Sequence, residues 1–307
     1  MTTVLNEEPP GRPVDWSGGL GLGRVLADDR PVVVLRRDGS SRARLAVVAG
    51  RTFEDLPGLL EAAGGDPSAV RAGEPVDAPD AALLCPVGRP RKIICVGVNY
   101  LTHVREAGQG DTPAHPTLFP KWDNALSDPY AEIPLPPESG QIDFESELAV
   151  VIGRRCRRVP AEHAGRVIFG YTAANDGSVR DFQVHTSQAV AGKAWDRLTP
   201  AGPVVVPAAQ LGGARPDLAL TGILDGQVVQ DDRTSNMMFG VPELVAYIST
   251  VMTLEAGDLI LTGTPAGVGI ARTPPLLLRD GSQFEVRIEG IGSLRNRYVA
   301  EKRSSHD

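Results

Sequence analysis

The sequence lacks the long apolar run that a membrane-spanning helix needs, because no stretch approaches the roughly 20 apolar residues required. It also has few cysteines, and Cys85, Cys95 and Cys156 lie far apart in no metal-binding spacing. The opening segment, MTTVLNEEPPGRPVDW, does not show the basic-then-apolar order of a signal peptide. These absences predict a cytoplasmic protein with buried, reduced thiols and no membrane partner.

The chain has few aromatic residues and no excess of positive charge. Aromatic residues make up 5% of the 307 residues, and 38 acidic residues outnumber 31 basic ones. This balance argues against nucleic acid or an anionic membrane as the main partner. There is no Gly-Lys-Ser/Thr phosphate loop, no Gly-x-Gly-x-x-Gly between a strand and a helix, and no Gly-x-Ser-x-Gly elbow. Nucleotide-binding and serine hydrolase functions are therefore disfavoured.

Glycine and proline are abundant, with 34 and 26 residues. Frequent turns favour many short strands over long helices, so we expect an α+β fold that is mainly β. Residues 1–85 predict a small α/β domain, in which RPVVVLRRDG is typical of a strand and TFEDLPGLLEAAGG of a short helix. The proline-spaced segment CPVGRPRKI leads into a larger domain over residues 86–302, and residues 303–307 predict a disordered polar tail.

The segment DFESELAVVIG carries the most informative pattern. In a strand, Asp143, Glu145 and Glu147 point to one side, and four apolar residues point to the other: Phe144, Leu148, Val150 and Ile152. Carboxylates this close raise one another's pKa unless a cation neutralises them, and Mg²⁺, Mn²⁺ or Ca²⁺ suits oxygen ligands. Asp176, on a turn after a later strand, is placed to add a third ligand. The alternative is an acidic strand face exposed to water.

A histidine and a glutamate form a second candidate group. His103 and Glu106 are three residues apart, so on a helical turn they share a face and can form a hydrogen bond. Such a pair is a competent general base for water. It follows the strand KIICVGVNY and precedes the glycine-rich stretch GQGDTPAHPT, an arrangement that favours a mobile lid over a site. The alternative is a surface pair with no catalytic role.

Two lysines and one turn complete the candidates. Lys193 lies between small residues and Trp195, where partial desolvation would let it stabilise an enolate or oxyanion. Lys121, in PTLFPKWDNAL, allows the same interpretation, and for both lysines simple solvation is the alternative. In GDLILTGTPAGVG, the Thr264 hydroxyl and the backbone amides could bind a carboxylate, or the segment could be only a tight turn.

Taken together, these segments resemble the fumarylacetoacetate hydrolase family, in its acylpyruvase and 2-hydroxyhepta-diene-dioate isomerase branch. Six blocks occur in the family's order: KIICVGVNYLTHVREAG, PTLFPKWDNAL, DFESELAVVIGRRCRRVP, GYTAANDGSVRDFQ, GKAWDRLTPAGPVVV and LEAGDLILTGTPAGVG. The resemblance implies a mixed β-sandwich or roll fold, a homodimer, and one Mg²⁺ or Mn²⁺ held by three carboxylates. These carboxylates fall on Glu145, Glu147 and Asp176.

The resemblance also implies roles for other residues. His103 and Glu106 would activate water on a lid that orders over substrate, and Lys193 would stabilise developing negative charge. The implied substrate contacts are Gln183 and Thr264 and, by the same matching, Asn99, Tyr100, Lys121 and Arg180. Two departures bear on the substrate rather than on the metal. Leu101 stands where many members have a basic residue, and Gly177 follows Asp176 where a bulkier residue is common.

The expected activity is metal-dependent hydrolysis of a carbon–carbon bond in a 1,3-dicarbonyl 2-oxo acid such as an acylpyruvate, in the breakdown of 2-oxo acids. Relatives of this fold also isomerise, decarboxylate or dehydrate 2-oxo acids, and that chemistry is the first alternative. A tailoring role on a larger natural product and a non-catalytic binding protein are the others.

Overall fold

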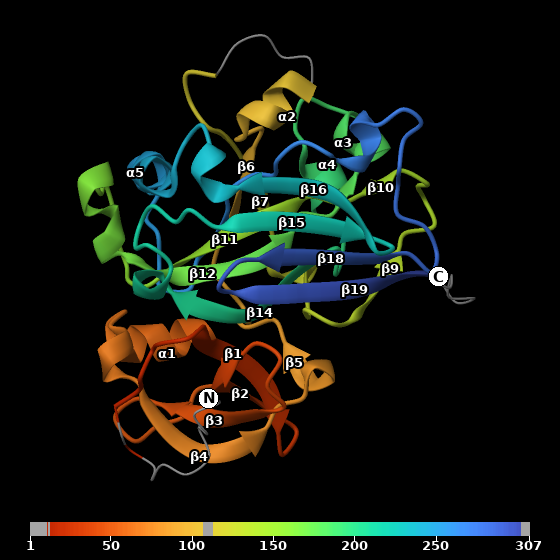
Figure 1. Cartoon of the computed structure of the whole chain (residues 1–307). Helices are drawn as coiled ribbons and strands as arrows, with labels where there is room; N and C mark the ends of the chain where they lie inside the picture. The colour runs from red at the N-terminus through yellow and green to blue at the C-terminus, as the bar shows by residue number, and fades with distance from the viewer. Residues whose placement is uncertain (1–10, 12, 107–112, 302–307) are drawn as a thin grey trace.

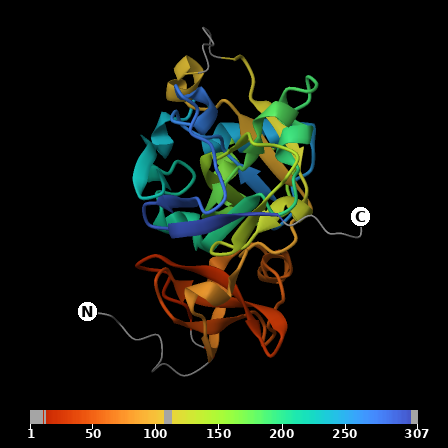
Figure 2. The ribbon, with the colours of Figure 1, turned by 90° about the vertical axis from the view of Figure 1, so that its right-hand side faces the viewer.

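The structure is a computed structural model that describes residue 11 and residues 13–106 and 113–301. The mainly β, α+β class expected from the sequence is confirmed. Figures 1 and 2 show the N-terminal strands, in red and orange, below a larger body of strands and short helices. None of the helices in the described part of the chain is long and apolar enough to cross a membrane.

The N-terminal region is built on antiparallel strands with one helix against them. Its elements are β1 (Leu20–Ala27), β2 (Arg30–Arg37), β3 (Arg42–Val47), α1 (Leu56–Ala63), β4 (Arg71–Asp77) and β5 (Leu83–Leu84). Helix α1 begins where the Asp55 side chain accepts a hydrogen bond from the Gly58 amide, and it ends at Gly64 in the left-handed conformation. The strand and helix predicted in this region are therefore confirmed.

The N-terminal strands continue into the central sheet, whose order is β4-β3-β2-β1-β14-β12-β11-β17-β6-β7. The further strands are β6 (Ile93–Gly97), β7 (Thr117–Lys121), β8 (Leu126–Ser127), β11 (Ser146–Ile152), β12 (Ile168–Asn175), β14 (Thr199–Pro207) and β17 (Leu259–Leu261). The two parts meet at the pair Leu22 and Val205. The boundary near residue 85 stays a prediction.

A second sheet, in the order β16-β15-β18-β19-β9, lies over the central one. Its strands are β9 (Glu132–Leu135), β15 (Ala219–Leu224), β16 (Gln227–Arg233), β18 (Gln283–Ile288) and β19 (Gly292–Ala300). The core between the sheets includes the Phe144 ring, which stacks on Phe284 with ring centres 4.5 Å apart. This packing is the β-sandwich that the family resemblance implies.

Short helices and turns lie around the two sheets. The helices are α2 (Leu101–Glu106), α3 (Arg180–Gln183), α4 (Val190–Lys193) and α5 (Val241–Val251), and a small sheet pairs β10 (Ile142–Asp143) with β13 (Ser178–Val179). The 3₁₀ turns are η1 (Pro67–Ala69), η2 (Asp80–Ala82), η3 (Asp123–Ala125), η4 (Ala161–Arg166), η5 (Ala208–Gln210), η6 (Thr234–Asn236) and η7 (Gly269–Ala271). Figure 1 places α2, α3 and α4 at the end of the sheets away from the N-terminal strands.

Strand β11 explains the unbroken apolar run in the sequence. Leu148, Val150 and Ile152 join the core between the two sheets, whereas Ala149 and Val151 join the core beneath the central sheet. A strand that is buried on both faces needs apolar residues at successive positions. The expectation of one continuous strand from residue 143 is wrong: the ladder breaks at residues 144–145, between β10 and β11.

Two expectations fall partly on residues that the structure leaves out. The predicted lid includes residues 107–112, and the predicted tail lies within residues 302–307, so that part of the lid and the whole tail lie outside the described residues. The helical turn that begins the predicted lid is present as α2.

Candidate active site and metal centre

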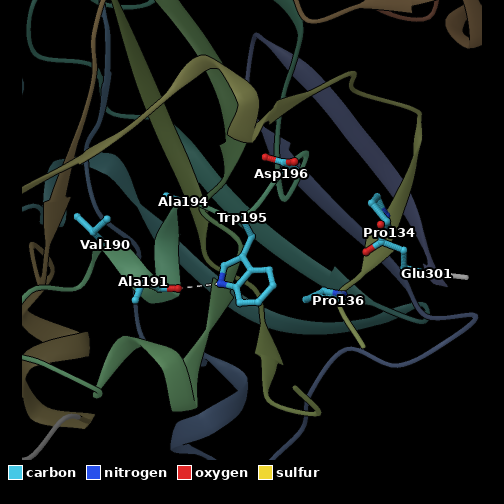
Figure 3. Close-up of a pocket in the computed structure, with 8 residues that line it drawn as sticks. All are labelled: Pro134, Pro136, Val190, Ala191, Ala194, Trp195, Asp196 and Glu301. Carbon is cyan, nitrogen blue, oxygen red and sulfur yellow. Dashed lines mark hydrogen bonds between the residues drawn. The ribbon is translucent and has the colours of Figure 1, made fainter. Parts of the chain in front are cut away.

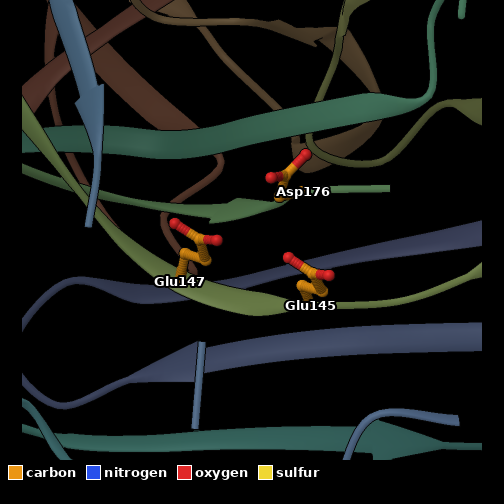
Figure 4. A group of neighbouring side chains, drawn as sticks. All are labelled: Glu145, Glu147 and Asp176. Atoms are coloured by element: carbon orange, nitrogen blue, oxygen red, sulfur yellow. The ribbon is translucent and has the colours of Figure 1, made fainter. Parts of the chain in front are cut away.

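Three buried carboxylates gather at the end of β11 and β12. Each of Glu145, Glu147 and Asp176 offers an oxygen within 4.8 Å of the others, and all three residues are buried. Figure 4 shows the three side chains turned toward one another. The structure thus brings together the three residues that the sequence proposed as metal ligands.

The pairing of β11 with β12 produces this convergence. Ser146 lies opposite Asn175, so the residues that flank the pair, Glu145 and Asp176, leave the ladder side by side. The Asp176 amide donates to the Glu145 carbonyl at 2.9 Å, and the Glu145 amide donates to Asn175 Oδ1 at 2.8 Å. Asn175 is held in turn by the Tyr298 hydroxyl at 2.7 Å. The side chain of Asn175 therefore satisfies the amide that the broken ladder leaves free.

Three cations surround the carboxylates. Lys193 Nζ lies 2.9 Å from both Glu145 Oε2 and Asp176 Oδ2. Arg180 Nη1 lies 2.8 Å from Glu145 Oε1, and Lys121 Nζ lies 2.5 Å from Asp176 Oδ1. Both lysines are buried, which overturns the alternative that they are simply solvated.

These cations do not reach the three carboxylates equally. Burial alone would raise the pKa of Glu145, but the charges of Lys193 and Arg180 outweigh it and lower the pKa to about 2. Burial raises the pKa of Glu147 well above its usual range, and the charges of Asp176 and Glu145 raise it further. The acidic face is thus neither exposed nor fully neutralised by the protein.

The donor set fits a hard divalent cation. Asp176 Oδ1 is buried and receives no well-directed hydrogen bond from residues 13–106 or 113–301, although the Lys121 ammonium is close. Glu147 Oε2 accepts a hydrogen bond from the Gly263 amide at 2.7 Å, and Glu147 has no cation partner among the described residues. Carboxylate oxygens in this number are ligands that Mg²⁺, Mn²⁺ and Ca²⁺ accept. The chain can therefore hold a divalent metal through Glu145, Glu147 and Asp176.

The predicted dyad forms on α2. His103 Nδ1 lies 3.1 Å from Glu106 Oε2, and both side chains are mostly buried, with 14% and 19% exposed. Glu106 Oε1 accepts a hydrogen bond from the Gly267 amide at 2.9 Å. His103 is close enough to the carboxylates for its charge to contribute to lowering the pKa of Glu145. The pair is therefore not fully exposed, and its catalytic role stays a prediction.

The loop that follows β17 touches both groups, and glycine is required along it. Gly263 and Gly267 have φ of +95° and +104°, which side chains rarely adopt. A Cβ at Gly267 would lie 2.1 Å from the Val229 carbonyl oxygen, and one at Gly269 would lie 2.0 Å from the Leu276 carbonyl oxygen. The TGTPAGVG segment is thus a tightly packed backbone connection between the metal ligands and the dyad.

Two of the predicted substrate-binding residues, Asn99 and Thr264, use their side chains in hydrogen bonds within the protein. The Asn99 amide bonds Thr262 and both backbone groups of Phe239. Thr264 Oγ1 donates to the Ser146 carbonyl at 3.0 Å and accepts from Gln230 at 2.8 Å. These hydrogen bonds show that Asn99 and Thr264 stabilise the local structure. Their contact with substrate stays a prediction.

Other predicted contacts keep unused polar atoms. The Tyr100 hydroxyl is buried and has no partner among the described residues, and burial together with the Glu147 charge raises its pKa well above the usual range. Arg180 Nη2 is also buried, with no partner in the part of the chain that the structure describes, and Arg180 Nη1 lies 3.0 Å from Gln183 Oε1. Arg180 and Gln183 line a cavity of about 670 Å³ together with Gln141, Asp181, Val184, Ser187, Ala189 and Ile270.

A separate cavity of about 460 Å³ lies beside α4, lined by Pro134, Pro136, Val190, Ala191, Ala194, Trp195, Asp196 and Glu301. Figure 3 shows the Trp195 ring within it, with its Nε1 donating to the Ala191 carbonyl at 2.8 Å. That bond fixes the residues next to Lys193. Lys193 itself faces the carboxylates and does not line this cavity.

Comparison with known proteins decides the family. A family model described as fumarylacetoacetate (FAA) hydrolase C-terminal matches residues 92–299. The chain belongs to the fumarylacetoacetate hydrolase family. It is 40% identical over 222 residues to the mitochondrial oxaloacetate tautomerase FAHD2A of Bos taurus, covering 72% of this chain and 70% of that protein.

Solved structures of this family agree with the fold. A fumarylacetoacetate hydrolase from Exiguobacterium antarcticum superposes with a TM-score of 0.75 at 32% identity, covering 92% of this chain and 100% of that chain. A 2-hydroxyhepta-2,4-diene-1,7-dioate isomerase from Mycobacterium marinum gives a TM-score of 0.69 at 34% identity, with the same coverage. The family thus includes relatives named as hydrolases, isomerases and tautomerases.

Sequence reasoning did not single out two features of the site. Asp143 was expected beside Glu145 and Glu147, but it lies outside the group of three and instead contacts Arg180 and the loop around Gly269. The Gly263 amide that holds Glu147 was also missed. The contacts of Asp143 with Gly269 and of Glu147 with Gly263 span more than one hundred residues of sequence, so no local motif predicts them.

Proposed function

We propose that this protein is a divalent-metal-dependent enzyme that interconverts the keto and enol forms of a 2-oxo acid with an acidic proton at C3, of the oxaloacetate class. The observation that carries the proposal is the His103–Glu106 pair beside the buried carboxylates and their cations. The relatives named oxaloacetate tautomerase support this choice of substrate class.

The residues of this chain divide the work. Glu106 accepts at Nδ1 of His103 and so orients the ring, which leaves Nε2 to remove the C3 proton. Arg180 and Lys193 supply positive charge where the 2-oxo oxygen becomes negative. A divalent ion at Glu145, Glu147 and Asp176 would add charge that favours the enolate. The cavity lined by Arg180 and Gln183 accommodates the rest of the substrate.

A second candidate is hydrolysis of the carbon–carbon bond of an acylpyruvate, the activity expected from the sequence. The same pair would then take a proton from water, which attacks the distal carbonyl, and the bond breaks to give a carboxylic acid and the enol of pyruvate. The intact His103–Glu106 pair favours this reaction over decarboxylation or dehydration, which need no activated water. A non-catalytic binding protein would need none of these groups.

Two assays separate the candidates. Purified protein with Mg²⁺ is mixed with enol oxaloacetate, and ketonisation and C3 deuterium exchange in D₂O are followed by NMR against Glu145→Ala. Acylpyruvates are then incubated in ¹⁸O-labelled water, and label is sought in the newly formed acid. Faster ketonisation without labelled acid supports the tautomerase, and labelled acid supports the hydrolase. If the protein neither speeds ketonisation, nor catalyses C3 exchange, nor forms labelled acid, both candidate activities are contradicted.

The proposal includes Mg²⁺ or Mn²⁺ as the natural metal, a homodimer and a cytoplasmic location. The three cysteines are free and buried, as expected in a reducing compartment. Burial raises the pKa of Cys85 and Cys156 to about 11, so their thiols are poorly reactive. The bovine relative is described as mitochondrial, and that description is of that protein.

A further inference from the structure

Asp143 is a fully buried carboxylate that the proposed reaction does not use directly. Its Oδ1 accepts from the Gly269 amide at 2.8 Å and from its neighbour Phe144 at 2.9 Å. Its Oδ2 accepts from the Ile270 amide at 3.0 Å and from Arg180 Nε at 2.8 Å. Four donors converge on the two oxygens, so both are fully used.

The loop that Asp143 anchors reaches the two working groups of the site. Going back along the chain from Gly269, the Gly267 amide donates to Glu106 of the dyad, and the Gly263 amide donates to Glu147. The left-handed conformation of Gly263 and Gly267 leaves this backbone little freedom between its anchors. The position of Glu106 is therefore tied to the two amides that Asp143 holds.

Only a carboxylate serves all four donors. An asparagine at this position keeps one acceptor oxygen, and its NH₂ group faces two N–H donors wherever it is placed. The two orphaned donors would be the Ile270 amide and Arg180 Nε if the oxygen stays at the Oδ1 side. A buried donor without an acceptor costs more than the bond contributed, so the loop and Arg180 would both shift.

We propose that Asp143 is the positioning residue of this site: by holding the amides of Gly269 and Ile270 together with Arg180, it fixes the loop that places Glu106 against His103. The inference rests on the proposed function for its catalytic consequence. The placement itself can be measured without substrate. Asp143 acts through Glu106 and Arg180 and touches no reacting atom.

The test uses Asp143→Asn in the full chain, without metal or substrate. ¹⁵N NMR at high pH reports the tautomer of neutral His103, assigned with His103→Asn. Because Glu106 accepts at Nδ1, the wild type should hold mainly the Nδ1–H form. In Asp143→Asn, the ratio of Nδ1–H to Nε2–H should fall by about tenfold, as expected when a hydrogen bond to a charged group is lost.

The matched control is Asp258→Asn. Asp258 is equally buried, and its carboxylate accepts from the amides of Lys92 and Glu255 and pairs with Lys92 Nζ at 2.8 Å. It lies at the other end of β17, so its loss should destabilise the fold without changing the His103 tautomer. An equal tautomer change in both variants would reduce Asp143 to a general structural residue and overturn the proposal.

A second measurement keeps the proposal testable if Asp143→Asn does not fold. In the wild type, hydrogen exchange at Gly267, Gly269 and Ile270 should be as slow as in β11, although these amides have no backbone acceptor. Rapid exchange there would overturn the proposal. Where activity is available, kcat should fall by about 100-fold with KM changed less than about threefold, as for a misplaced catalytic group. A loss of kcat/KM that comes entirely from a higher KM, with kcat unchanged, would contradict the proposal.

Discussion

The N-terminal region and the candidate site both bury charged side chains, and they balance them in opposite ways. Arg36 is fully buried on β2, its Nε donates to the Ala78 carbonyl at 3.1 Å, and its ion-pair partner Asp80 is 50% exposed. At the site, by contrast, four buried carboxylates face three cations: Asp143, Glu145, Glu147 and Asp176 against Lys121, Lys193 and Arg180.

The difference separates a structural charge from a functional one. The Arg36 pair reaches water on one side, so it needs nothing from outside the protein. At the site the carboxylates outnumber the cations, and Glu147 has no cation of its own among the described residues. Isolated buried charge is costly, and a divalent ion would remove that cost. Surplus buried carboxylate is thus the feature that marks the metal centre.

The largest effect should follow from removing one of the three carboxylates that can hold the metal. Asp176→Asn should weaken Mn²⁺ binding by more than the roughly 100-fold that loss of an outer partner costs, and abolish turnover with it. Calorimetric titration with Mn²⁺ measures this directly. Asp80→Asn, the matched change in the N-terminal region, should leave Mn²⁺ affinity unaltered. Equal affinities in Asp176→Asn and the wild type would remove Asp176 from the metal centre.

Loss of the proposed base, His103, should leave metal binding nearly unchanged. His103→Asn removes the ring that Glu106 orients, so turnover should fall by about 10²–10⁴-fold, while Mn²⁺ affinity stays within a few-fold of the wild type. Parallel kinetics and titration separate the two. A comparable drop in Mn²⁺ affinity would mean that His103 belongs to the metal centre rather than to the proton transfer.

Replacing the buried Arg36 of the N-terminal region should lower stability and leave activity unchanged. Arg36→Met leaves the buried Ala78 carbonyl without its donor, and should lower the free energy of unfolding by about 1–3 kcal/mol. Activity per folded molecule should stay at the wild-type level. Urea denaturation provides the measurement, and Arg42→Met, at an exposed position, is the control. Reduced activity in fully folded Arg36→Met would show that the two regions are coupled.

The smallest effect concerns pH. The raised pKa of Glu147 means that the metal-free protein keeps a proton there as pH rises through the usual carboxyl range, and a cation must displace it. Mn²⁺ affinity should therefore increase with pH by up to about tenfold per unit. The same shift makes the metal-free fold less stable as pH rises through this window. Titrations in two buffers count the released proton, and Glu147→Gln should remove the dependence.

Local patterns in the sequence predicted much of the site. Alternation along β11 placed Glu145 and Glu147 on one face, the turn after β12 supplied Asp176, and the three-residue spacing paired His103 with Glu106. The pairing of His103 with Glu106 follows from helix geometry alone, whereas the position of Glu145 also depends on the break in the ladder before β11. The break before β11 could not be predicted, because the Glu145 and Ser146 amides bond the side chains of Asn175 and Gln230, the latter 84 residues away.

Partners that are distant in the sequence also explain the hydrogen bonds that Asn99 and Thr264 make within the protein. The same holds for the anchoring role of Asp143. Asp143 meets the Gly269 amide across 126 residues of sequence. The N-terminal region shows a further limit: the predicted strand and helix are present, yet nothing local in the sequence shows that β1 continues the central sheet by pairing with β14 at Leu22 and Val205. Composition and spacing describe neighbours along the chain, whereas such contacts arise only when the sheets pack.

The crowding around Gly267 and Gly269 has a consequence for redesign of the catalyst. A library that varied these positions would consist mainly of chains in which any side chain collides with a carbonyl oxygen. New substrate preferences must instead come from the side chains of the adjoining cavity, where Val184 is 78% exposed and Ile270 is 37% exposed. Saturation of Val184, Ser187 and Ile270 would therefore vary the lining of this cavity while leaving the carboxylates and the His103–Glu106 pair intact.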